Sequence, residues 1–501
     1  MPSKPRITRR ELVAAGVTGT ALAAVPNAWA ARLLDKTPRI GPGTFLDGVA
    51  TGEPTANAVT FWSRLRTDRP RSGAELFVAR DEQMKDVVRR TIVPTGQGID
   101  GTLKARIGDL DPREEYFYQF VSGTDESPVG RTLTAPAAGS KENLRIISSS
   151  CQIYERGFFN ALRDARTRVR EPDLALMLGD YIYETASGPA AVRQDPIETT
   201  DLASYRAKFE LYRSDPDLRE LHRRIPMMHV WDDHDVSDNY NEPGAKRATA
   251  QQRNFAYRAT FEWLPRMTMA TERHRIYRRL AYGAMADVFL LDERQYREGD
   301  VDGRARRLLG EAQMKWLIDG LRASKATWKI IAQQVVVAQI PFGVGAQGQG
   351  VFNDDAWDGY REDRDRLLDA IDAANIDNVV FLTGDVHVFM ANQLPTRFNE
   401  LTYDRVAKPG VATEYVTGAV TNIGITQPER ELQQQAPWNM QYDGLNKGYG
   451  VLQLGAKNLR TEFYGAPAYP TATTPVAMLQ QFDQAEGTNQ IERTTPASTG
   501  G

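Results

Sequence analysis

The stretch VWDDHDVSDN, residues 230–239, combines four carboxylates, one histidine and one amide within ten residues. It ends an apolar run from Ile225 to Trp231, which we interpret as a strand. Carboxylates this close repel one another unless a cation neutralises them. The loop is therefore either a metal site or a solvated acidic loop, and the ends of the other predicted strands bear on that choice.

After Lys141 the pattern alternates between strands and helices, which is typical of an α/β layered domain. Apart from the strand at 225–231, strands are expected at 144–148, 173–178, 286–291, 328–337 and 378–382. We expect residues 141–466 to form this domain. Residues 467–501 are rich in Thr, Ala, Pro, Gln and Gly, and we expect them to form a mobile tail.

Residues 38–137 have a different pattern and are predicted to form a β-sandwich of immunoglobulin or fibronectin type. Short segments rich in β-formers, such as Ala58–Trp62 and Tyr116–Val121, are separated by Gly, Pro and Asp turns. This region contains no histidine and no cysteine. We therefore expect the chemistry to lie in the second domain.

Residues 1–30 are interpreted as an export signal. Arg6, Arg9 and Arg10 precede an uncharged run, residues 12–25, and a small-x-small cleavage site follows at residues 28–30. Residues 8–13, TRRELV, resemble the motif read by the twin-arginine export machinery, and an ordinary Sec signal is the alternative. The predicted location is periplasmic or secreted. No later segment reaches roughly 18 uninterrupted apolar residues, so no transmembrane segment is expected in the mature chain.

The overall composition gives no support for nucleic acid as a binding partner, because acidic and basic residues are nearly balanced. The 501 residues include 62 Lys and Arg against 65 Asp and Glu, for a net charge of -3. The single cysteine, Cys151, excludes an internal disulfide. We expect a monomer that acts on a phosphate-ester substrate, for the reasons that follow.

Polar side chains follow four of the predicted strands, and function in α/β sheets gathers at the carboxyl ends of strands. Two of these loops pair an acid with a histidine, although the chain holds only five histidines. We interpret the four loops as one metal site. They are Ser149-Ser150-Cys151, Gly179-Asp180-Tyr181-Ile182-Tyr183, Asp232-Asp233-His234-Asp235 and Thr383-Gly384-Asp385-Val386-His387.

The residue types constrain the metals. Thiolate, phenolate, imidazole and carboxylate together favour a transition metal, with Fe³⁺ the natural match for phenolate and Zn²⁺ the alternative. A second site built from Asp233, Asp385 and a bridging Asp180 suits Ca²⁺, Mg²⁺ or Mn²⁺. Such a pair clamps a phosphoryl group for attack by metal-activated hydroxide at phosphorus. His234 could donate a proton to the leaving oxygen or the transition state.

These motifs resemble those of the calcineurin-like metallophosphatases, and Gly179–Tyr183 is similar to the Gly-Asp-x-x-Tyr of purple acid phosphatases. Cys151 stands where the first aspartate usually is, and residues 232–235 and 384–387 replace Gly-Asn-His-Asp and Gly-His-x-His. With LDERQYR at 291–297 and WDGY at 357–360, these departures resemble the PhoD-type alkaline phosphatase/phosphodiesterase family. Residues 45–54, FLDGVATGEP, look like the opening of that family's β domain.

The resemblance implies hydrolysis of phosphomonoesters, phosphodiesters or both at alkaline pH, outside the cytoplasm. It implies Fe³⁺ held by Cys151, Asp180, Tyr183 and His387, and Ca²⁺ held by Asp180, Asp233 and Asp385, with Zn²⁺ or Mn²⁺ as substitutes. It also places His234 near the phosphate.

Several further residues have two readings. Arg294 and Arg156 either bind phosphate or are surface or ion-paired arginines. Gln333 or Gln334 is a further candidate ligand, and Glu184 is expected to support the site through the ligands. His229 is predicted to be a core histidine, and His222 and His274 to be surface residues.

Three other functions remain open. A phospholipase D-like diesterase would share the chemistry but act on lipid headgroups. A non-catalytic surface protein would bind metal or phosphate through the β domain. A cysteine-dependent phosphatase would use Cys151 as a nucleophile, but such enzymes place an arginine about six residues later, where this chain has Gly157.

Overall fold

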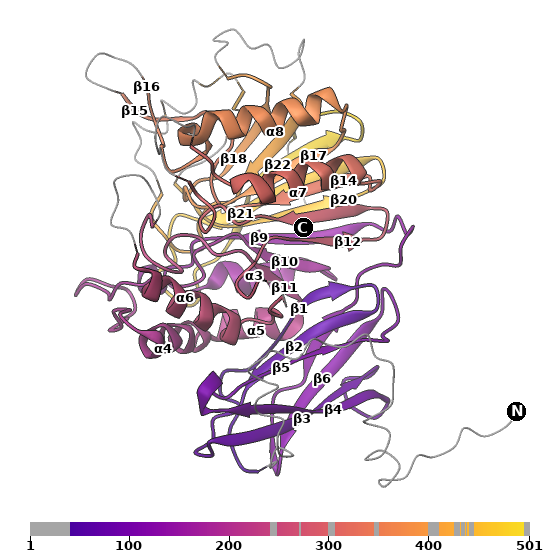
Figure 1. The fold of residues 1–501 in the computed structure, drawn as a ribbon, viewed down its shortest axis with the longest axis vertical. Helices are drawn as coiled ribbons and strands as arrows, with labels where there is room; N and C mark the ends of the chain where they lie inside the picture. Colours follow the sequence, from indigo (N-terminus) through magenta and orange to yellow (C-terminus); the bar gives the residue numbers. More distant parts are fainter. Residues whose placement is uncertain are drawn as a thin grey trace, which may run out of the picture.

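The computed structural model describes residues 41–240, 248–269, 272–298, 306–344, 350–398, 410–424, 431, 436, 438, 439 and 445–494. A β-sandwich lies at one end of the long axis, and a larger layered α/β part lies at the other (Figure 1). This is the predicted fold class. The expected export signal, residues 1–30, lies outside the described residues.

The sandwich consists of two antiparallel sheets packed face to face. One sheet has the order β1 (Val49–Thr55), β2 (Ala58–Arg64), β5 (Thr102–Ile107). The other has the order β4 (Val87–Gly96), β3 (Arg71–Ala79), β6 (Glu115–Ser122), β7 (Asp125–Glu126), with β8 (Gly130–Leu133) also paired to β6. Alternate residues of β6 are buried, as expected for a strand with one face on the core.

Two further sheets form the larger part. The seven-stranded sheet has the order β11 (Met227–His229), β10 (Leu174–Met177), β9 (Leu144–Ser149), β20 (Lys447–Leu454), β21 (Asn458–Ala466), β22 (Ala477–Ala485), β23 (Glu492–Thr494). The six-stranded sheet has the order β12 (Arg278–Tyr282), β13 (Ala286–Leu290), β14 (Trp328–Ala332), β17 (Val379–Thr383), β19 (Ala412–Val416), β18 (Met390–Leu394).

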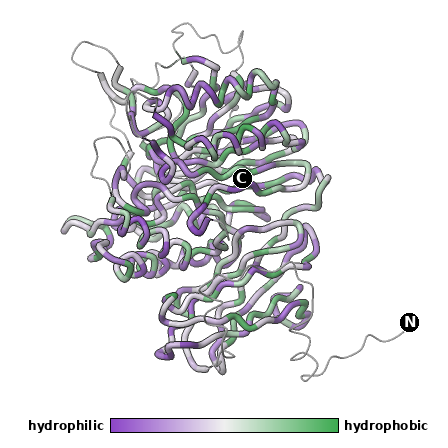
Figure 2. Tube along the Cα trace, viewed as in Figure 1, coloured by the Kyte–Doolittle hydropathy of each residue, from purple (hydrophilic) through white to green (hydrophobic). Residues whose placement is uncertain are grey.

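Helices cover the two sheets (Figure 1). The helices α7 (Gly310–Ala323) and α8 (Arg361–Ala373) pack on the outer face of the six-stranded sheet. The hydrophobic core that the two sheets share also takes side chains from α3 (Asn160–Arg168), α4 (Leu202–Arg213), α5 (Pro216–Arg224) and α6 (Ala250–Trp263). Neighbouring residues of the central strands point into different cores, for example Val380 and Phe381 of β17. This two-sided burial explains why these strands read as continuous apolar runs, which Figure 2 shows as green segments.

The parallel strands fix where the loops lie. β9, β10 and β11 run parallel, as do β13, β14, β17 and β19. Their carboxyl ends therefore lie at one edge of each sheet, and the two edges adjoin: a bridge between Ser150 and Ala419 links them. The chemistry-bearing loops start at this shared edge.

The sandwich is joined to the second part by specific contacts. The indole Nε1 of Trp62 donates to the backbone oxygen of Glu262 at 2.8 Å. The rings of Trp62 and Trp263 lie 5.9 Å apart. The C-terminal end of α6 therefore rests directly on β2.

Residues 467–494 differ from the expected mobile tail, because β22 and β23 extend the seven-stranded sheet. Phe482 is fully buried against Phe463, with ring centroids 5.6 Å apart. The side chain of Gln484 accepts a hydrogen bond from Thr413 of the other sheet at 2.9 Å. The polar composition that suggested a tail thus belongs to strands whose glutamines bond to Thr494 within the sheet or, for Gln484, to the other sheet.

Two histidine predictions have different outcomes. His229 is buried in β11, as predicted for a core residue. His222 was expected at the surface and is fully buried, because it lies on the same face of α5 as Leu218. The hydroxyl of Tyr181 lies 2.9 Å from His222 Nε2.

Among the described residues, no helix is both long and apolar enough to cross a membrane.

Candidate metal centre

The loops after β9, β10, β11 and β17 meet at the shared edge of the two sheets. The backbone N–H of Cys151 donates to Gly179 O at 3.1 Å, and that of Gln152 donates to Asp180 O at 3.2 Å. Four candidate ligands have positive φ: 54° at Cys151, 56° at Asp180, 62° at Asp385 and 59° at His387. Residues with a side chain rarely adopt this conformation, and such strain concentrates at functional sites.

The side chains of these loops form three overlapping groups of metal-ligand atoms. The groups are Cys151, Asp180 and His387; Asp180, Asp233 and His234; and Asp232, Asp233 and Asp385. Within each group the atoms lie within 4.8 Å of one another. Asp180 belongs to two groups and Asp233 to two, so the donors form one continuous line. This is the arrangement that two neighbouring cations require.

Tyr183 completes the cysteine end of this line. Its hydroxyl donates to Asp180 Oδ2 at 2.8 Å, and it is 2 % exposed. The Cys151 sulfur also lies in this corner, 3.8 Å from the backbone oxygen of Asp385. All four predicted iron ligands are therefore brought together.

Arg294 lies at the carboxylate end and is fully buried. Its guanidinium is ion-paired with Asp232, lies 2.6 Å from Asp355, and is 3.3 Å from both Asp233 and Asp385. Of the two readings of this residue, the structure shows the ion-paired one. The arginine neutralises part of the negative charge that gathers around Asp233.

Protonation equilibria in the site fit a bound cation. Burial and the neighbouring carboxylates raise the pKa of Asp180 and Asp385 well above their ordinary values, although His234 opposes this at Asp180 and Arg294 at Asp385. Burial also raises the pKa of Asp232 to about 6. Asp180 Oδ1 and Asp232 Oδ2 are buried and have no hydrogen-bond partner in the described part of the chain. Asp180 and Asp385 therefore stay ionised together only if a bound cation replaces their protons, whereas for Asp233 the charges of Arg294 and His234 outweigh burial and lower the pKa.

The side chains at the cysteine end also need a bound cation to be deprotonated. Burial raises the pKa of the Cys151 thiol well above its ordinary value, so the thiolate needs a metal partner. Burial and the nearby His234 lower the pKa of His387 to about 3, which leaves its ring neutral and able to bind a metal through a ring nitrogen. The residues present therefore fit a transition metal at this end and a hard cation at the other.

His234 is the most accessible of these side chains, at 23 % exposure. Its Nδ1 lies 2.8 Å from Glu184 Oε2, and its Nε2 is 3.8 Å from Asp238 Oδ1, beyond hydrogen-bond distance. Burial lowers the pKa of His234, but the charges of Asp233, Asp180 and Glu184 outweigh it and raise that pKa well above its ordinary value. The raised pKa favours the doubly protonated ring, with one proton on Nδ1 toward Glu184 and the other on Nε2.

Comparison with known proteins places this site in a family. Residues 146–463 match the model of the PhoD-like phosphatases, and residues 29–136 match the model of their N-terminal domain. The chain belongs to the PhoD-like phosphatase family. It is thus a hydrolase of phosphate esters.

Individual relatives agree with this assignment. Alkaline phosphatase D of Bacillus subtilis (strain 168) is 31% identical over 427 residues, which span 78% of this chain and 72% of that protein. A solved structure of PhoD superposes with a TM-score of 0.83 at 27% identity, covering 92% of this chain and 94% of that one. A purple acid phosphatase from yellow lupin, at 13% identity and a TM-score of 0.59, covers 89% of this chain and 75% of its own, and shares the fold.

Three residues of this PhoD-like phosphatase site have roles that the sequence analysis did not assign. The carboxylate of Asp235 accepts the N–H groups of Asp180 at 3.0 Å and Asp232 at 2.9 Å, so it braces two ligand loops. Asp355 anchors Arg294. Asn422 contacts Tyr183 and His387. Asp235 lies in a loop that the sequence analysis named, and Asp355 is an acid just before the WDGY motif, whereas Asn422 has no comparable signal.

The two candidate glutamines differ. The side-chain oxygen of Gln334 accepts the backbone N–H of Glu293 at 3.1 Å, and its NH₂ group donates to the backbone oxygen of Leu291 at 3.1 Å. Gln333 donates to Thr383 at 3.1 Å, and its Oε1 is buried with no partner in the described chain. Gln333 therefore remains a candidate ligand. Arg156 is 48% exposed, and His274 is half-buried rather than a surface residue.

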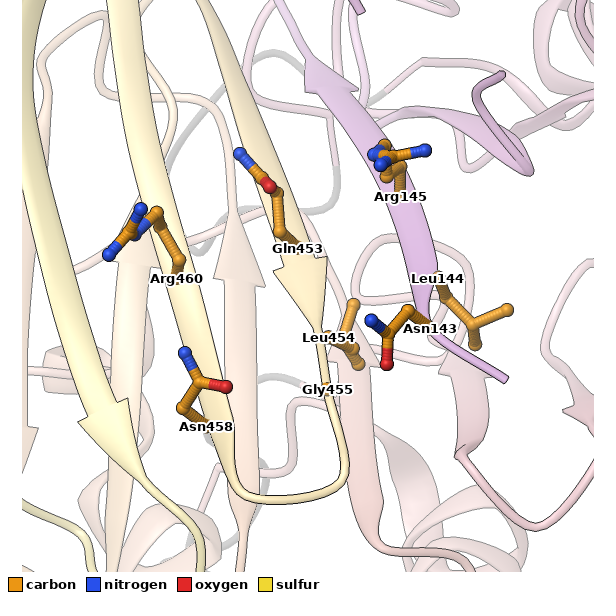
Figure 3. Close-up of a pocket in the computed structure, with 8 residues that line it drawn as sticks. All are labelled: Asn143, Leu144, Arg145, Gln453, Leu454, Gly455, Asn458 and Arg460. Carbon is orange, nitrogen blue, oxygen red and sulfur yellow. The ribbon is translucent and has the colours of Figure 1, made fainter. Parts of the chain in front are cut away.

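A cavity of about 210 Å³ lies at the opposite end of the seven-stranded sheet (Figure 3). Leu144 starts β9 there and Leu454 ends β20, whereas Cys151 follows the other end of β9. None of the candidate metal ligands lines this cavity. It is therefore separate from the metal centre.

Proposed function

We propose that this protein is an exported phosphoesterase with a mixed Fe³⁺–Ca²⁺ centre, which hydrolyses phosphomonoesters, phosphodiesters or both at alkaline pH. Cys151, Asp180, Tyr183 and His387 are the proposed ligands of Fe³⁺. Asp180, Asp233 and Asp385 are the proposed ligands of Ca²⁺. Zn²⁺ or Mn²⁺ are the alternative metals.

One observation carries the proposal: the line of donor atoms that runs from Cys151 to Asp385 and shares Asp180 and Asp233. Its two ends differ in chemistry. Thiolate, phenolate and imidazole lie at one end and only carboxylates at the other, which favours two different metals. The shared Asp180 supports a bridging role.

The cations, when bound, supply Lewis acidity that makes hydroxide available near neutral pH and neutralises charge on the phosphoryl oxygens. The protein's own side chains do the rest. Glu184 can only accept at its carboxylate, so Nδ1 of His234 carries a proton and the ring orientation is fixed. The raised pKa favours a second proton on Nε2 of this partly exposed side chain, and that proton can move to the leaving oxygen.

Arg294 has a supporting role in this proposal. Its four carboxylate contacts saturate the guanidinium, so it holds Asp233 and Asp385 in place rather than reaching the phosphate directly. This differs from the role in phosphate binding considered from the sequence. The reason is burial, which the sequence alone does not show.

The proposed location is periplasmic or secreted, with export by the twin-arginine machinery. Two features support this location. Residues 1–30 contain the arginine pair and the cleavage site. The twin-arginine route exports folded proteins, so the proposed metal centre could be assembled before export. Fractionation of cells expressing the full chain and an Arg9→Lys/Arg10→Lys variant tests it, with retention of the variant in the cytoplasm as the expected result.

The function is tested with a chromogenic phosphomonoester and the matching diester, before and after chelation. We expect turnover that a calcium-selective chelator abolishes and added Ca²⁺ restores. Asp180→Asn is expected to be inactive under all conditions, whereas Asp319→Asn, which removes a 55%-exposed surface carboxylate paired with Lys315, leaves turnover unchanged. Turnover that survives complete metal removal would contradict the proposal and favour Cys151 as a nucleophile.

A further inference from the structure

Asn422 occupies a fixed place beside the cysteine end of the site. It follows β19 on a segment that runs along the loop after β9: Val420 N donates to Ser150 O at 2.8 Å, and Thr421 Oγ1 donates to Ile153 O at 2.7 Å. Asn422 itself is 7% exposed. Its backbone is therefore held against the loop that carries Cys151.

The orientation of the Asn422 amide follows from its partners. Its Oδ1 accepts the backbone N–H of Ile423 at 2.7 Å. Because only an oxygen can accept that proton, the NH₂ group must point the other way. There Nδ2 lies 2.9 Å from the Tyr183 hydroxyl oxygen and 3.0 Å from His387 Nε2.

The two contacts behave differently when a metal binds. A neutral imidazole nitrogen has one lone pair, and a metal at His387 Nε2 would use it. A phenolate oxygen keeps lone pairs after one metal bond, so it can still accept from Asn422. The hydrogen bond to Tyr183 therefore persists and becomes charge-assisted.

We propose that Asn422 is a positioning residue, which donates a hydrogen bond to the Tyr183 phenolate and holds it toward the metal. In the described part of the chain, Asp180 accepts from this tyrosine and Asn422 donates to it. Asn422 thus compensates part of the phenolate charge, which the Asp180 carboxylate does not. This inference rests on the proposed metal site and adds a residue that tunes it.

The test compares Asn422→Leu with Thr421→Val. The first removes the donor at nearly constant volume, and the second removes a hydrogen bond of the same segment that touches no proposed ligand. Affinity is measured for Fe³⁺ and, separately, for Zn²⁺, together with the visible spectrum of the iron form. Partners of metal ligands typically contribute 10–100-fold to metal affinity, so we expect a loss of roughly that size for Asn422→Leu and little for Thr421→Val.

The iron spectrum gives a second readout. Loss of a donor raises the electron density on the phenolate, so the tyrosinate-to-iron band of Asn422→Leu should move to longer wavelength, while that of Thr421→Val should stay in place. In a Tyr183→Phe background the effect of Asn422→Leu on affinity should largely vanish, because the partner is gone. If Asn422→Leu does not fold, as judged by its melting curve, Asn422→Ala replaces it with the same expectations.

The outcomes separate this inference from the proposed function. If the wild type takes Zn²⁺ but not iron, the ferric assignment fails, and Asn422 is judged by the Zn²⁺ affinities alone. Equal losses in Asn422→Leu and Thr421→Val, or an undiminished effect in the Tyr183→Phe background, would overturn the positioning role. A wild type that binds neither metal overturns both proposals.

Discussion

Both ends of the donor line bury ligand groups that are negatively charged when deprotonated, and the two ends differ in what compensates that charge. At the cysteine end, the neutral amide of Asn422 contacts the ligands Tyr183 and His387. At the carboxylate end, a buried cation is built into the protein, because Arg294 pairs with Asp232, Asp233, Asp355 and Asp385. The thiol and phenol of the first end need a metal to lose their protons, whereas at the second end Arg294 offsets part of the carboxylate charge before a metal binds.

This difference suggests a division of labour. The cysteine end provides neutral and soft donors suited to one tightly held transition metal. The carboxylate end provides oxygen donors and a fixed positive charge, which suits a more weakly held hard cation. The predictions below test this contrast.

The largest effect is expected where the two ends meet, at Asp180. Asp180→Asn removes the shared carboxylate, so both metals should be lost and kcat/KM should fall by more than about 10,000-fold, or about 5.5 kcal/mol of transition-state stabilisation. Steady-state kinetics and metal content of the purified variant measure this. A variant that retains both metals would show that the ends are independent.

His234→Gln should affect chemistry without emptying either end. General acid catalysis contributes typically 10²–10⁴-fold, so we expect kcat to fall by about 1,000-fold with both metals retained. Esters with better leaving groups need less protonation, and the variant should lose less with them. An equal loss for good and poor leaving groups would argue against proton donation by His234.

Arg294→Met should act on stability at the carboxylate end alone. Removing one partner of a buried ion pair typically costs 3–5 kcal/mol, so the free energy of unfolding should fall by about 3 kcal/mol. Added Ca²⁺ should recover more stability in the variant than in the wild type, because it replaces the missing charge. Chemical unfolding with and without Ca²⁺ decides this, and an equal response of both proteins would contradict the contrast.

The smallest effect is expected for Glu184→Gln, about tenfold in kcat, or about 1.4 kcal/mol. The amide keeps a hydrogen-bond acceptor for His234 Nδ1 but loses the charge that, with Asp233 and Asp180, raises the pKa of this histidine. A lower pKa means that the proton is lost at lower pH. The alkaline limb of the pH–rate profile should therefore move to lower pH, and an unmoved limb would exclude this role.

The sequence was informative where local pattern and chemistry coincide. Acids and histidines directly after apolar runs identified the loops that the structure brings together at Asp180, Asp233, Asp385 and His387. The β-sandwich followed from its turns and β-formers. In both cases the signal lies within a few neighbouring residues.

The sequence failed where a role depends on distant neighbours. Asn422 follows β19, an unanticipated strand, and gains its role only because the segment folds back along Ser150. Arg294 could not be assigned, because its burial depends on carboxylates from three other loops. The segment that forms β22 and β23 looked like a tail, because composition does not show whether a glutamine is solvated or, like Gln484, bonds to a second sheet.

The central claim is that the two ends of the donor line hold different metals, and metal analysis with an absorption spectrum of the purified mature protein tests it most directly. We predict about one iron per chain together with calcium, and a visible band from tyrosinate or thiolate to Fe³⁺ that Tyr183→Phe shifts or removes. A colourless protein that holds only zinc or manganese would contradict the assignment of Cys151 and Tyr183 to iron, and with it the contrast between the two ends.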